Sequence, residues 1–322
     1  MQRKTFVTAC AATSTLAFRP LCASAADVEY DLTTPTGTIA GTLLAPNRSG
    51  RLPVALIVAG SGPTDRNRNS PILALNIYAK LASALAESGI ATVRYDKRGI
   101  AASSAAMPSE KDIRFDQYVD DVVAWVAKLR ADGRFSSVTL VGHSEGSLVG
   151  MCAAAKTTVD GYGSLEGAGF PANEVLTRQL AERLAPLPDL KAQADRILAS
   201  LTRGTPVAEA DVPPLLQSLF RPSVQPYLMS WFAYDPRVQI ARASGRITIV
   251  QGTNDVQVSV EDGRALAAAR PQAAFVLIDG MTHVLVDDPG TTLADQLKGA
   301  YADPLRPLDA RLVRTLVTAA SA

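Results

Sequence analysis

The chain has 322 residues, of which 47% are hydrophobic and 20% are charged, and its formal net charge at pH 7 is +1. This balance is typical of a globular protein with a large apolar core. Charges of both signs are well mixed and no run of lysines or arginines occurs, so we expect no nucleic-acid partner.

The first 25 residues predict an export signal. A basic start at residues 2–4 precedes a mainly apolar stretch over 5–18, and Ala23-Ser24-Ala25 has the small-x-small pattern of a cleavage site. The apolar stretch is too short to span a membrane. We therefore expect cleavage after Ala25, no stable membrane insertion, and export to a bacterial periplasm or to the medium.

The rest of the chain alternates between strand and helix patterns. Residues 28–32 and 38–44, separated by a Pro-Thr-Gly turn, predict an antiparallel edge of a sheet. Amphipathic and apolar patterns predict helices over 71–87 and 112–130 and a largely helical end over 291–320, with strands at 54–59, 91–93, 138–141, 247–250 and 275–278. This alternation predicts an α/β protein with a mostly parallel sheet covered on both faces.

Residues 160–236 interrupt the alternation. Glycines open this segment, two weak helices are predicted over 173–184 and 190–201, and prolines follow. We expect a helical cap, so that 26–159 and 237–322 form the two parts of the core. Five large apolar residues of the cap either line a substrate pocket or pack the cap onto the core: Phe220, Tyr227, Met229, Trp231 and Phe232.

The most specific motif is Gly142-His143-Ser144-Glu145-Gly146, directly after the strand at 138–141. This is G-x-S-x-G at a strand-to-helix turn. A serine hydroxyl is a weak nucleophile that must stand clear of the sheet, beside a base and beside donors for the oxyanion. Ser144 is therefore the candidate nucleophile. Cys152, on the helix that follows, is expected to be a small buried residue.

A serine nucleophile needs a base, and the chain has two histidines. His143 lies inside the turn, where its side chain is expected to point away from Ser144. His283 follows the strand at 275–278, and α/β sheets place their chemistry at the carboxyl ends of strands. His283 is therefore the candidate base.

A third residue should orient the imidazole and stabilise its charged form. Asp255 follows the strand at 247–250 and is the candidate, with Asp279 and Asp235 as alternatives. The chain order serine, aspartate, histidine differs from the orders of the chymotrypsin and subtilisin arrangements.

Four segments together make the chain resemble an α/β-hydrolase: Gly60-Ser61-Gly62-Pro63-Thr64-Asp65-Arg66, Arg94-Tyr95-Asp96-Lys97-Arg98-Gly99, the G-x-S-x-G turn, and the Asp255 and His283 loops. The chain is similar to bacterial serine esterases and to acyl-peptidase-like and dienelactone-hydrolase-like members. The resemblance implies an α/β-hydrolase fold with a helical cap and a serine hydrolase that needs no cofactor or metal. It implies cleavage of small-molecule esters with small or short acyl chains through an acyl-enzyme. A peptidase, amidase or thioesterase with the same triad, and a non-catalytic binding protein on the same fold, are the alternatives.

The resemblance also implies an oxyanion hole, formed by the backbone N–H groups of Ser61 and Glu145. Gly62 is the alternative to Ser61, whereas Pro63 has no N–H group to offer. The carboxyl group of Glu145 itself is expected to be solvated.

Two charged segments near this loop are expected to be structural. Arg66 is expected to brace its loop through Asp65, or alternatively to meet an anionic substrate group. Residues 96–99 are expected to form a turn that takes no part in the chemistry.

Overall fold

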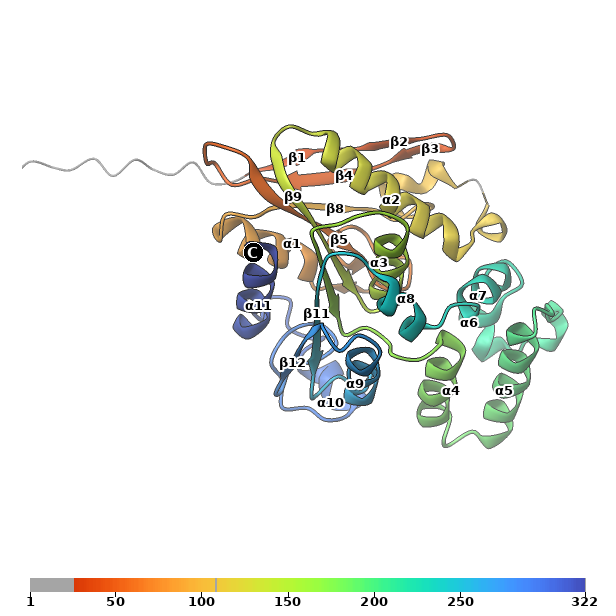
Figure 1. The fold of residues 1–322 in the computed structure, drawn as a ribbon. Coiled ribbons are helices and arrows are strands. Elements are labelled where there is room, and N and C mark those ends of the chain that lie inside the picture. Colours follow the sequence, from red (N-terminus) through yellow and green to blue (C-terminus); the bar gives the residue numbers. More distant parts are fainter. Residues whose placement is uncertain (1–25, 108, 322) are drawn as a thin grey trace, which may run out of the picture.

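The computed structural model describes residues 26–107 and 109–321, so the predicted export signal lies outside the described residues. The centre of the fold is a twisted eight-stranded sheet with helices on both faces (Figure 1). Its strand order is β1-β4-β8-β5-β9-β10-β11-β12. The strands span Asp27–Glu29 (β1), Gly41–Leu44 (β4), Ala91–Tyr95 (β8), Leu52–Val58 (β5), Phe135–His143 (β9), Gly161–Leu165 (β10), Arg246–Gly252 (β11) and Ala274–Ile278 (β12).

Most neighbouring strands of this sheet are parallel, as predicted. Strand β4 pairs antiparallel with β1 and with β8, and the remaining pairs from β8 to β12 are parallel. Two short hairpins stand outside the sheet, β2 (Leu32–Thr34) with β3 (Gly37–Ile39) and β6 (Asn69–Ser70) with β7 (Leu73–Ala74). Strand β5 reads as an apolar run because both faces of the sheet are covered.

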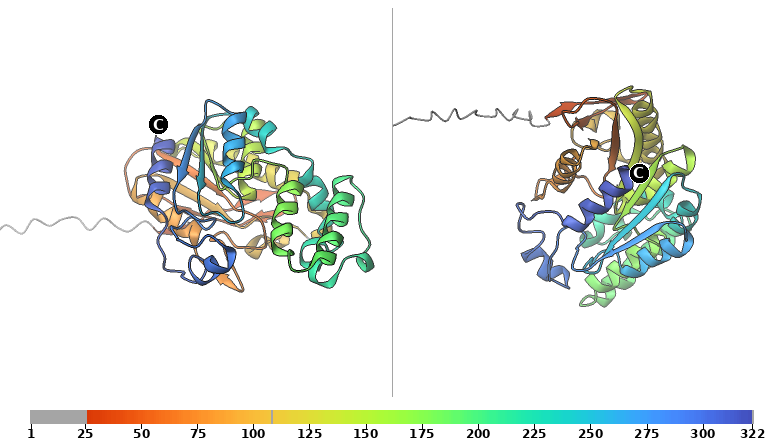
Figure 2. Two further views of the ribbon diagram at one scale, coloured as in Figure 1. Left: turned by 90° about the horizontal axis from the view of Figure 1, so that it is seen from below. Right: turned by 60° about the vertical axis from the view of Figure 1, so that its left-hand side comes forward.

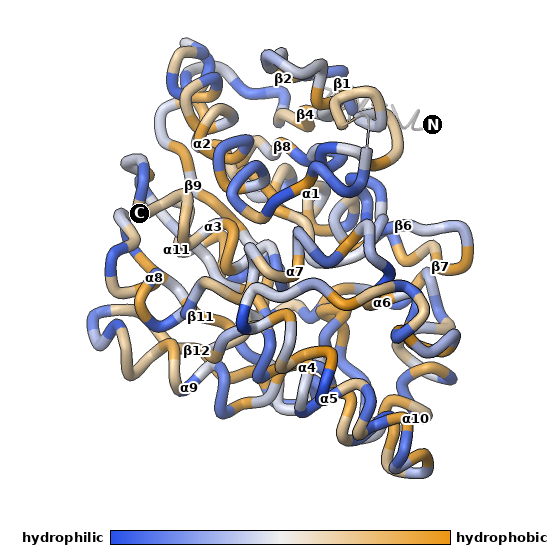
Figure 3. The backbone as a smooth tube through the Cα atoms, turned by 90° about the vertical axis from the view of Figure 1, so that its right-hand side faces the viewer, coloured by the Kyte–Doolittle hydropathy of each residue, from blue (hydrophilic) through white to orange (hydrophobic). Residues whose placement is uncertain are grey.

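Helices form a layer on each face of the sheet (Figure 2). One face is covered by α1 (Ile77–Glu87) and α11 (Ala310–Ser321). The other is covered by α2 (Phe115–Ala131), α3 (Glu145–Lys156), α8 (Pro236–Arg242) and α9 (Val260–Ala269). In Figure 3 hydrophobic residues run along the central strand β9, which lies between these layers. None of the described helices is both long and apolar enough to cross a membrane.

Two predicted helices begin later than the sequence suggests. The predicted helix over 71–87 starts at Ile77, because residues 69–74 form the β6–β7 hairpin. The predicted helix over 112–130 starts at Phe115, after a single 3-10 turn over Glu110–Asp112. In both segments the residues ahead of the helix belong to the connection that precedes it.

The predicted start of the cap at residue 160 is wrong, because Gly161–Leu165 forms strand β10 inside the sheet, between β9 and β11. Its glycines suggested a loop in place of a strand. They are needed because the neighbouring strand is close: a Cβ at Gly161 would lie 2.9 Å from Thr139 Oγ1. The segment outside the sheet therefore begins after β10.

Four helices follow β10 and lie beyond one end of the sheet (Figure 1). They are α4 (Ala172–Arg183), α5 (Pro188–Thr202), α6 (Gln217–Phe220) and α7 (Gln225–Phe232). A further short helix, α10 (Leu293–Lys298), lies between β12 and α11. The bounds of α4 and α5 agree with the two weak helices predicted from the sequence.

Candidate active site

Ser144 stands on a strained turn between β9 and α3. Its backbone has φ 56° and ψ −124°, a conformation that non-glycine residues rarely adopt. The turn is possible because of its glycines. A Cβ at Gly146 would lie 2.2 Å from the carbonyl oxygen of Val58, and a Cβ at Gly142 would lie 2.3 Å from the carbonyl oxygen of Gly146. The backbone N–H of Ser144 donates to Leu165 at 2.9 Å, which ties the turn to β10.

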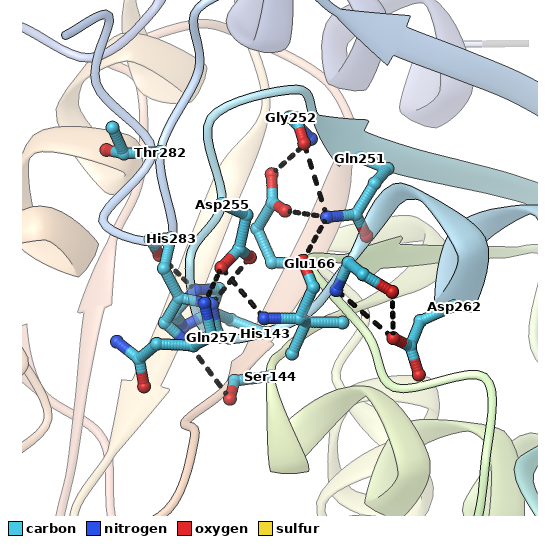
Figure 4. A network of polar contacts seen from close by, with 12 residues as sticks. His143, Ser144, Glu166, Gln251, Gly252, Asp255, Gln257, Asp262, Thr282 and His283 are labelled. Carbon is cyan, nitrogen blue, oxygen red and sulfur yellow. Dashed lines mark hydrogen bonds and ion pairs between the residues drawn. The ribbon is translucent and has the colours of Figure 1, made fainter. Parts of the chain in front are cut away.

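The three predicted site residues meet at the carboxyl ends of their strands (Figure 4). His283 Nε2 lies 3.1 Å from Ser144 Oγ, and His283 Nδ1 lies 2.7 Å from Asp255 Oδ2. The side chains of His283 and Asp255 are 1% and 0% exposed, so water does not compete for their hydrogen bond. The carboxylate accepts a hydrogen bond from the Nδ1–H group, which leaves Nε2 unprotonated and able to take a proton from the serine hydroxyl.

The two alternative acids lie elsewhere in the fold. Asp279 accepts a hydrogen bond from Thr253 Oγ1 at 3.0 Å. Asp235 caps α8 by accepting from the backbone N–H of Arg237, and it also forms an ion pair with that side chain. Asp255 is thus the aspartate of the three that contacts His283.

Backbone groups and a second acid hold Asp255. Its Oδ1 accepts from the N–H groups of Gln257 and Val258, at 2.7 and 2.9 Å. Burial raises the pKa of Asp255, but His283 and the hydrogen bonds from Glu166 and the backbone outweigh this, and the pKa is lowered overall. Asp255 therefore stays ionised, as the orienting acid must.

Glu166, which sequence reasoning missed, is fully buried directly after β10. Its oxygens accept from the backbone N–H of Gly252 at 2.9 Å and from Gln251 Nε2 at 2.5 Å (Figure 4). No ion pair to Glu166 occurs within residues 26–107 and 109–321. Burial, together with the charge of Asp255, raises the pKa of Glu166 well above its usual value. Of these two acids, Glu166 holds the proton and Asp255 holds the charge.

His143 does not contact Ser144, as predicted, but its side chain links two loops of the site. Its Nε2 lies 2.8 Å from the carbonyl oxygen of His283, and its Nδ1 lies 2.9 Å from the hydroxyl of Tyr78. That hydroxyl accepts in turn from the N–H of Gly60, at 3.0 Å. Burial lowers the pKa of His143 well below its usual value, so the ring is neutral and donates from Nε2.

The predicted oxyanion residues border the nucleophile. Ser61 and Glu145 line one cavity together with Ser144 and His283. Gly60, just before this loop, lies against the nucleophile, because a Cβ there would be 3.1 Å from Ser144 Cβ. The loop that bears Ser61 therefore runs directly past the nucleophile.

The expectation that the Glu145 carboxyl group is solvated is wrong. This side chain is 3% exposed, and its Oε2 lies 3.5 Å from Lys97 Nζ. Lys97 also donates to the carbonyl oxygen of Gly60, at 2.7 Å. The 96–99 turn thus reaches the wall of the site, which the sequence did not indicate.

Two further expectations have clear outcomes. Arg66 pairs with Asp96 at 2.7 Å, not with Asp65, because the loop folds back over the end of β8.

Cys152 is buried on α3, and burial raises the pKa of its thiol to about 12, so it is an inert packing residue as predicted.

A cavity of about 330 Å³ extends from Ser144 under the helices that follow β10. Its apolar walls come mainly from α4 and α7, with Leu148 and Val258 from the core. Both predicted roles occur among the five apolar residues expected in the cap. All five pack in or against the hydrophobic core, and Tyr227 and Trp231 in addition line this cavity.

A serine on a strained strand-to-helix turn, with an aspartate and a histidine from later strand-end loops, defines a serine hydrolase of the α/β-hydrolase superfamily. A family model described as serine aminopeptidase, S33, matches residues 74–290, which is more than half of the chain. The chain belongs to this family.

Known proteins agree with this class. Esterase EstD from Thermotoga maritima is 24% identical over 281 residues, which cover 85% of this chain and 64% of that protein. Among solved structures, the α/β hydrolase GrgF from Penicillium sp. sh18 aligns with a TM-score of 0.60 at 20% identity, over 92% of this chain and 100% of its own. Est1E from Butyrivibrio proteoclasticus aligns with a TM-score of 0.54 at 16% identity, over 84% and 95%. These structural matches confirm the predicted α/β-hydrolase fold.

Proposed function

We propose that the protein is a carboxylesterase-type serine hydrolase that cleaves small-molecule esters through an acyl-enzyme. The observation that carries the proposal is the continuous hydrogen-bonded chain from Ser144 Oγ through His283 to Asp255. The similarity to an esterase, EstD, supports an ester as the bond cleaved. The apolar cavity beside Ser144 suits an uncharged acyl or alcohol group.

The reaction follows from the positions of these groups. Ser144 Oγ attacks the ester carbonyl carbon while His283 Nε2 takes the hydroxyl proton, and the N–H groups of Ser61 and Glu145 receive the oxyanion. His283 returns the proton to the leaving alcohol as the acyl-enzyme forms. Water then attacks the acyl-enzyme, again giving its proton to His283, and the acid leaves as Ser144 recovers its hydrogen.

The test is hydrolysis of p-nitrophenyl acetate by wild type, by S144A and by the control S88A, which changes an exposed serine far along the chain. We expect S144A to lose at least a thousandfold in kcat while its circular dichroism and Tm stay close to those of wild type, and S88A to keep full activity. Substantial hydrolysis by folded S144A would refute the assignment. A wild type that neither hydrolyses the ester nor reacts with a fluorophosphonate would identify a non-catalytic member of the fold.

A peptidase is the second candidate, because the matching family is described by aminopeptidase activity. The same triad acts on amides when the leaving amine can be protonated. Comparing p-nitrophenyl acetate with alanine p-nitroanilide separates the two, since we expect kcat/KM to favour the ester by at least a hundredfold. A preference for the anilide would make the protein a peptidase.

We propose in addition that α4–α7 form a cap over Ser144 and that residues 1–25 direct export and are removed. The cap is supported by the contribution of α4 and α7 to the cavity wall. Intact mass of the protein recovered from a periplasmic fraction tests the second point, with a mature chain beginning at Ala26 expected. A full-length chain confined to the cytoplasm would contradict it.

A further inference from the structure

A second cavity opens from the same site on the side of Lys97. Its volume is about 230 Å³, and it contacts neither Ser144 nor His283 directly. The two cavities share the wall formed by residues 61–63, Glu145, Arg221, Val224 and Tyr227. The second cavity is therefore a side chamber of the site, which we call the Lys97 chamber.

Two residues that line the Lys97 chamber each have a buried polar atom with no partner among the described residues. One is Glu145 Oε1, since Lys97 Nζ contacts the other carboxyl oxygen, Oε2. The second is the hydroxyl of Tyr227. Buried polar groups are nearly always hydrogen-bonded, and a carboxyl oxygen left alone is costly. Glu145 Oε1 accepts only, so its missing partner is a hydrogen-bond donor.

The charges around the chamber cancel. Lys97 pairs with Glu145, and Arg221 pairs with Glu110 through Nη2 and Oε1. An ammonium group placed at Glu145 Oε1 would also face the buried Lys97, and a carboxylate would face Glu145. A neutral donor avoids both repulsions, and among neutral donors a hydroxyl group suits a lone acceptor.

The rest of the wall is apolar and large enough for a ring. Met107, Ile113 and Val224 line it together with the rings of Tyr118 and Tyr227. A cavity of about 150 Å³ holds a benzene ring, so one of this volume holds a ring with a substituent. The apolar wall and the lone acceptor together describe a ring-sized hydrocarbon group with one hydroxyl.

We propose that the Lys97 chamber is a subsite for a neutral, ring-sized part of the ester that carries a hydroxyl group, which donates to Glu145 Oε1 and contacts the hydroxyl of Tyr227. This inference rests on the proposed esterase function. It adds a substrate class to it, namely esters with a hydroxylated ring on the acid or the alcohol side.

Two matched substrate pairs test the subsite. On the acid side, methyl 3-(4-hydroxyphenyl)propanoate is compared with methyl 3-phenylpropanoate. On the alcohol side, 2-(4-hydroxyphenyl)ethyl acetate is compared with 2-phenylethyl acetate. Acid release is followed in a pH-stat at pH 7, where the phenol is neutral. For each pair the ratio of kcat/KM, hydroxylated over plain, is measured in wild type, E145M, Y227F and W231F.

In wild type we expect a ratio of about ten or more in at least one pair, because a hydrogen bond to a charged group is worth that much. E145M should bring this ratio to within twofold of one, and Y227F should lower it at least threefold. Trp231 lines the main cavity and not the Lys97 chamber, so the control W231F should change the ratio by less than twofold. Because E145M also borders the oxyanion hole, the ratio is compared and not the rate, and Y227F decides the question should E145M fold poorly.

A ratio near one in wild type for both pairs overturns the subsite, and so does a high ratio that survives in both E145M and Y227F. Hydrolysis of the plain esters in those experiments would leave the esterase function standing. Failure of wild type to hydrolyse any of the four esters or to react with a fluorophosphonate would instead refute the proposed function itself.

Discussion

His143 holds the loop that carries His283, since its Nε2 donates to the His283 carbonyl oxygen at 2.8 Å. Through Tyr78 the same ring is connected to Gly60, at the start of the loop expected to receive the oxyanion. One neutral imidazole therefore joins the two loops on either side of Ser144. His143 is a positioning residue, because it does not itself line the main cavity and acts through His283 and Tyr78.

We predict that H143A lowers kcat on p-nitrophenyl acetate by roughly tenfold. It should also destabilise the fold by about 1–3 kcal/mol, because the buried carbonyl oxygen of His283 and the buried hydroxyl of Tyr78 each lose a hydrogen-bond partner.

The pH dependence of stability gives a sharper test of the role of His143. Since the pKa of His143 is lowered in the folded state, its contribution to stability is present above the unfolded pKa of about 6.5 and is lost as pH falls below it, at up to about 1.4 kcal/mol per pH unit. Urea unfolding from pH 7 to 5 should give a flatter curve for H143A than for wild type, and parallel curves would contradict this.

Asp255 sets the tautomer of His283, so D255N should be far more harmful than its size suggests. An amide at this position donates to Nδ1 in place of accepting from it, and Nε2 then carries the proton and cannot act as base. We predict a loss of about 10³–10⁴-fold in kcat with the fold intact. The matched control is D279N, which changes the neighbouring aspartate that bonds Thr253 and should stay within threefold of wild type. Equal losses in both variants would remove Asp255 from the mechanism.

Glu166 should lower the free energy of unfolding as pH rises. Its pKa is raised in the folded state, so its contribution to stability is present below the unfolded pKa, about 4.5, and is lost as pH rises towards the folded value. E166Q carries no charge at any pH and escapes this loss. The free energy of unfolding of E166Q minus that of wild type should therefore increase between pH 5 and pH 8, measured by urea titration. A difference that stays constant with pH would show that Glu166 is ionised in the fold.

Gly146 tests the geometry of the turn. A Cβ at this position would lie 2.2 Å from the Val58 carbonyl oxygen, in rigid strand backbone. We predict that G146A destabilises the protein by about 3 kcal/mol or more, as expected for severe overpacking, and abolishes activity with it. The control G133A places its methyl group where no atom lies within 4 Å and should shift Tm by less than 2 °C. A stable, active G146A would mean that the turn is looser than described.

The strand-end residues of the site were predictable because they follow short apolar runs, and parallel strands bring such ends together. This applied to Ser144, Asp255 and His283, each of which follows a predicted strand. The order of strands in the sheet did not enter that argument, because any order of parallel strands keeps their carboxyl ends on one edge.

What the sequence left out depends on contacts between distant segments. Strand β10 was not predicted because its glycines are typical of a loop. At Gly161 the reason for the glycine is the closeness of Thr139 on the neighbouring strand. Glu166 and Lys97 are charged residues in otherwise ordinary turns, and their burial is set by the segments that cover them. For Glu166 the preceding Gly161–Leu165 gave no strand signal, and the role of this acid depends on a neighbour 89 positions along the chain, Asp255.

The central claim is that Ser144 becomes acylated during turnover. Wild type mixed with excess p-nitrophenyl acetate, quenched in acid within the first turnovers and digested, should give the peptide containing Ser144 with an added acetyl group, detected by mass spectrometry. That adduct should be absent from S144A, and it should disappear from wild type as the substrate is exhausted. Continued ester hydrolysis with the acetyl group on another residue, or with no acyl-enzyme and full activity in S144A, would contradict the account.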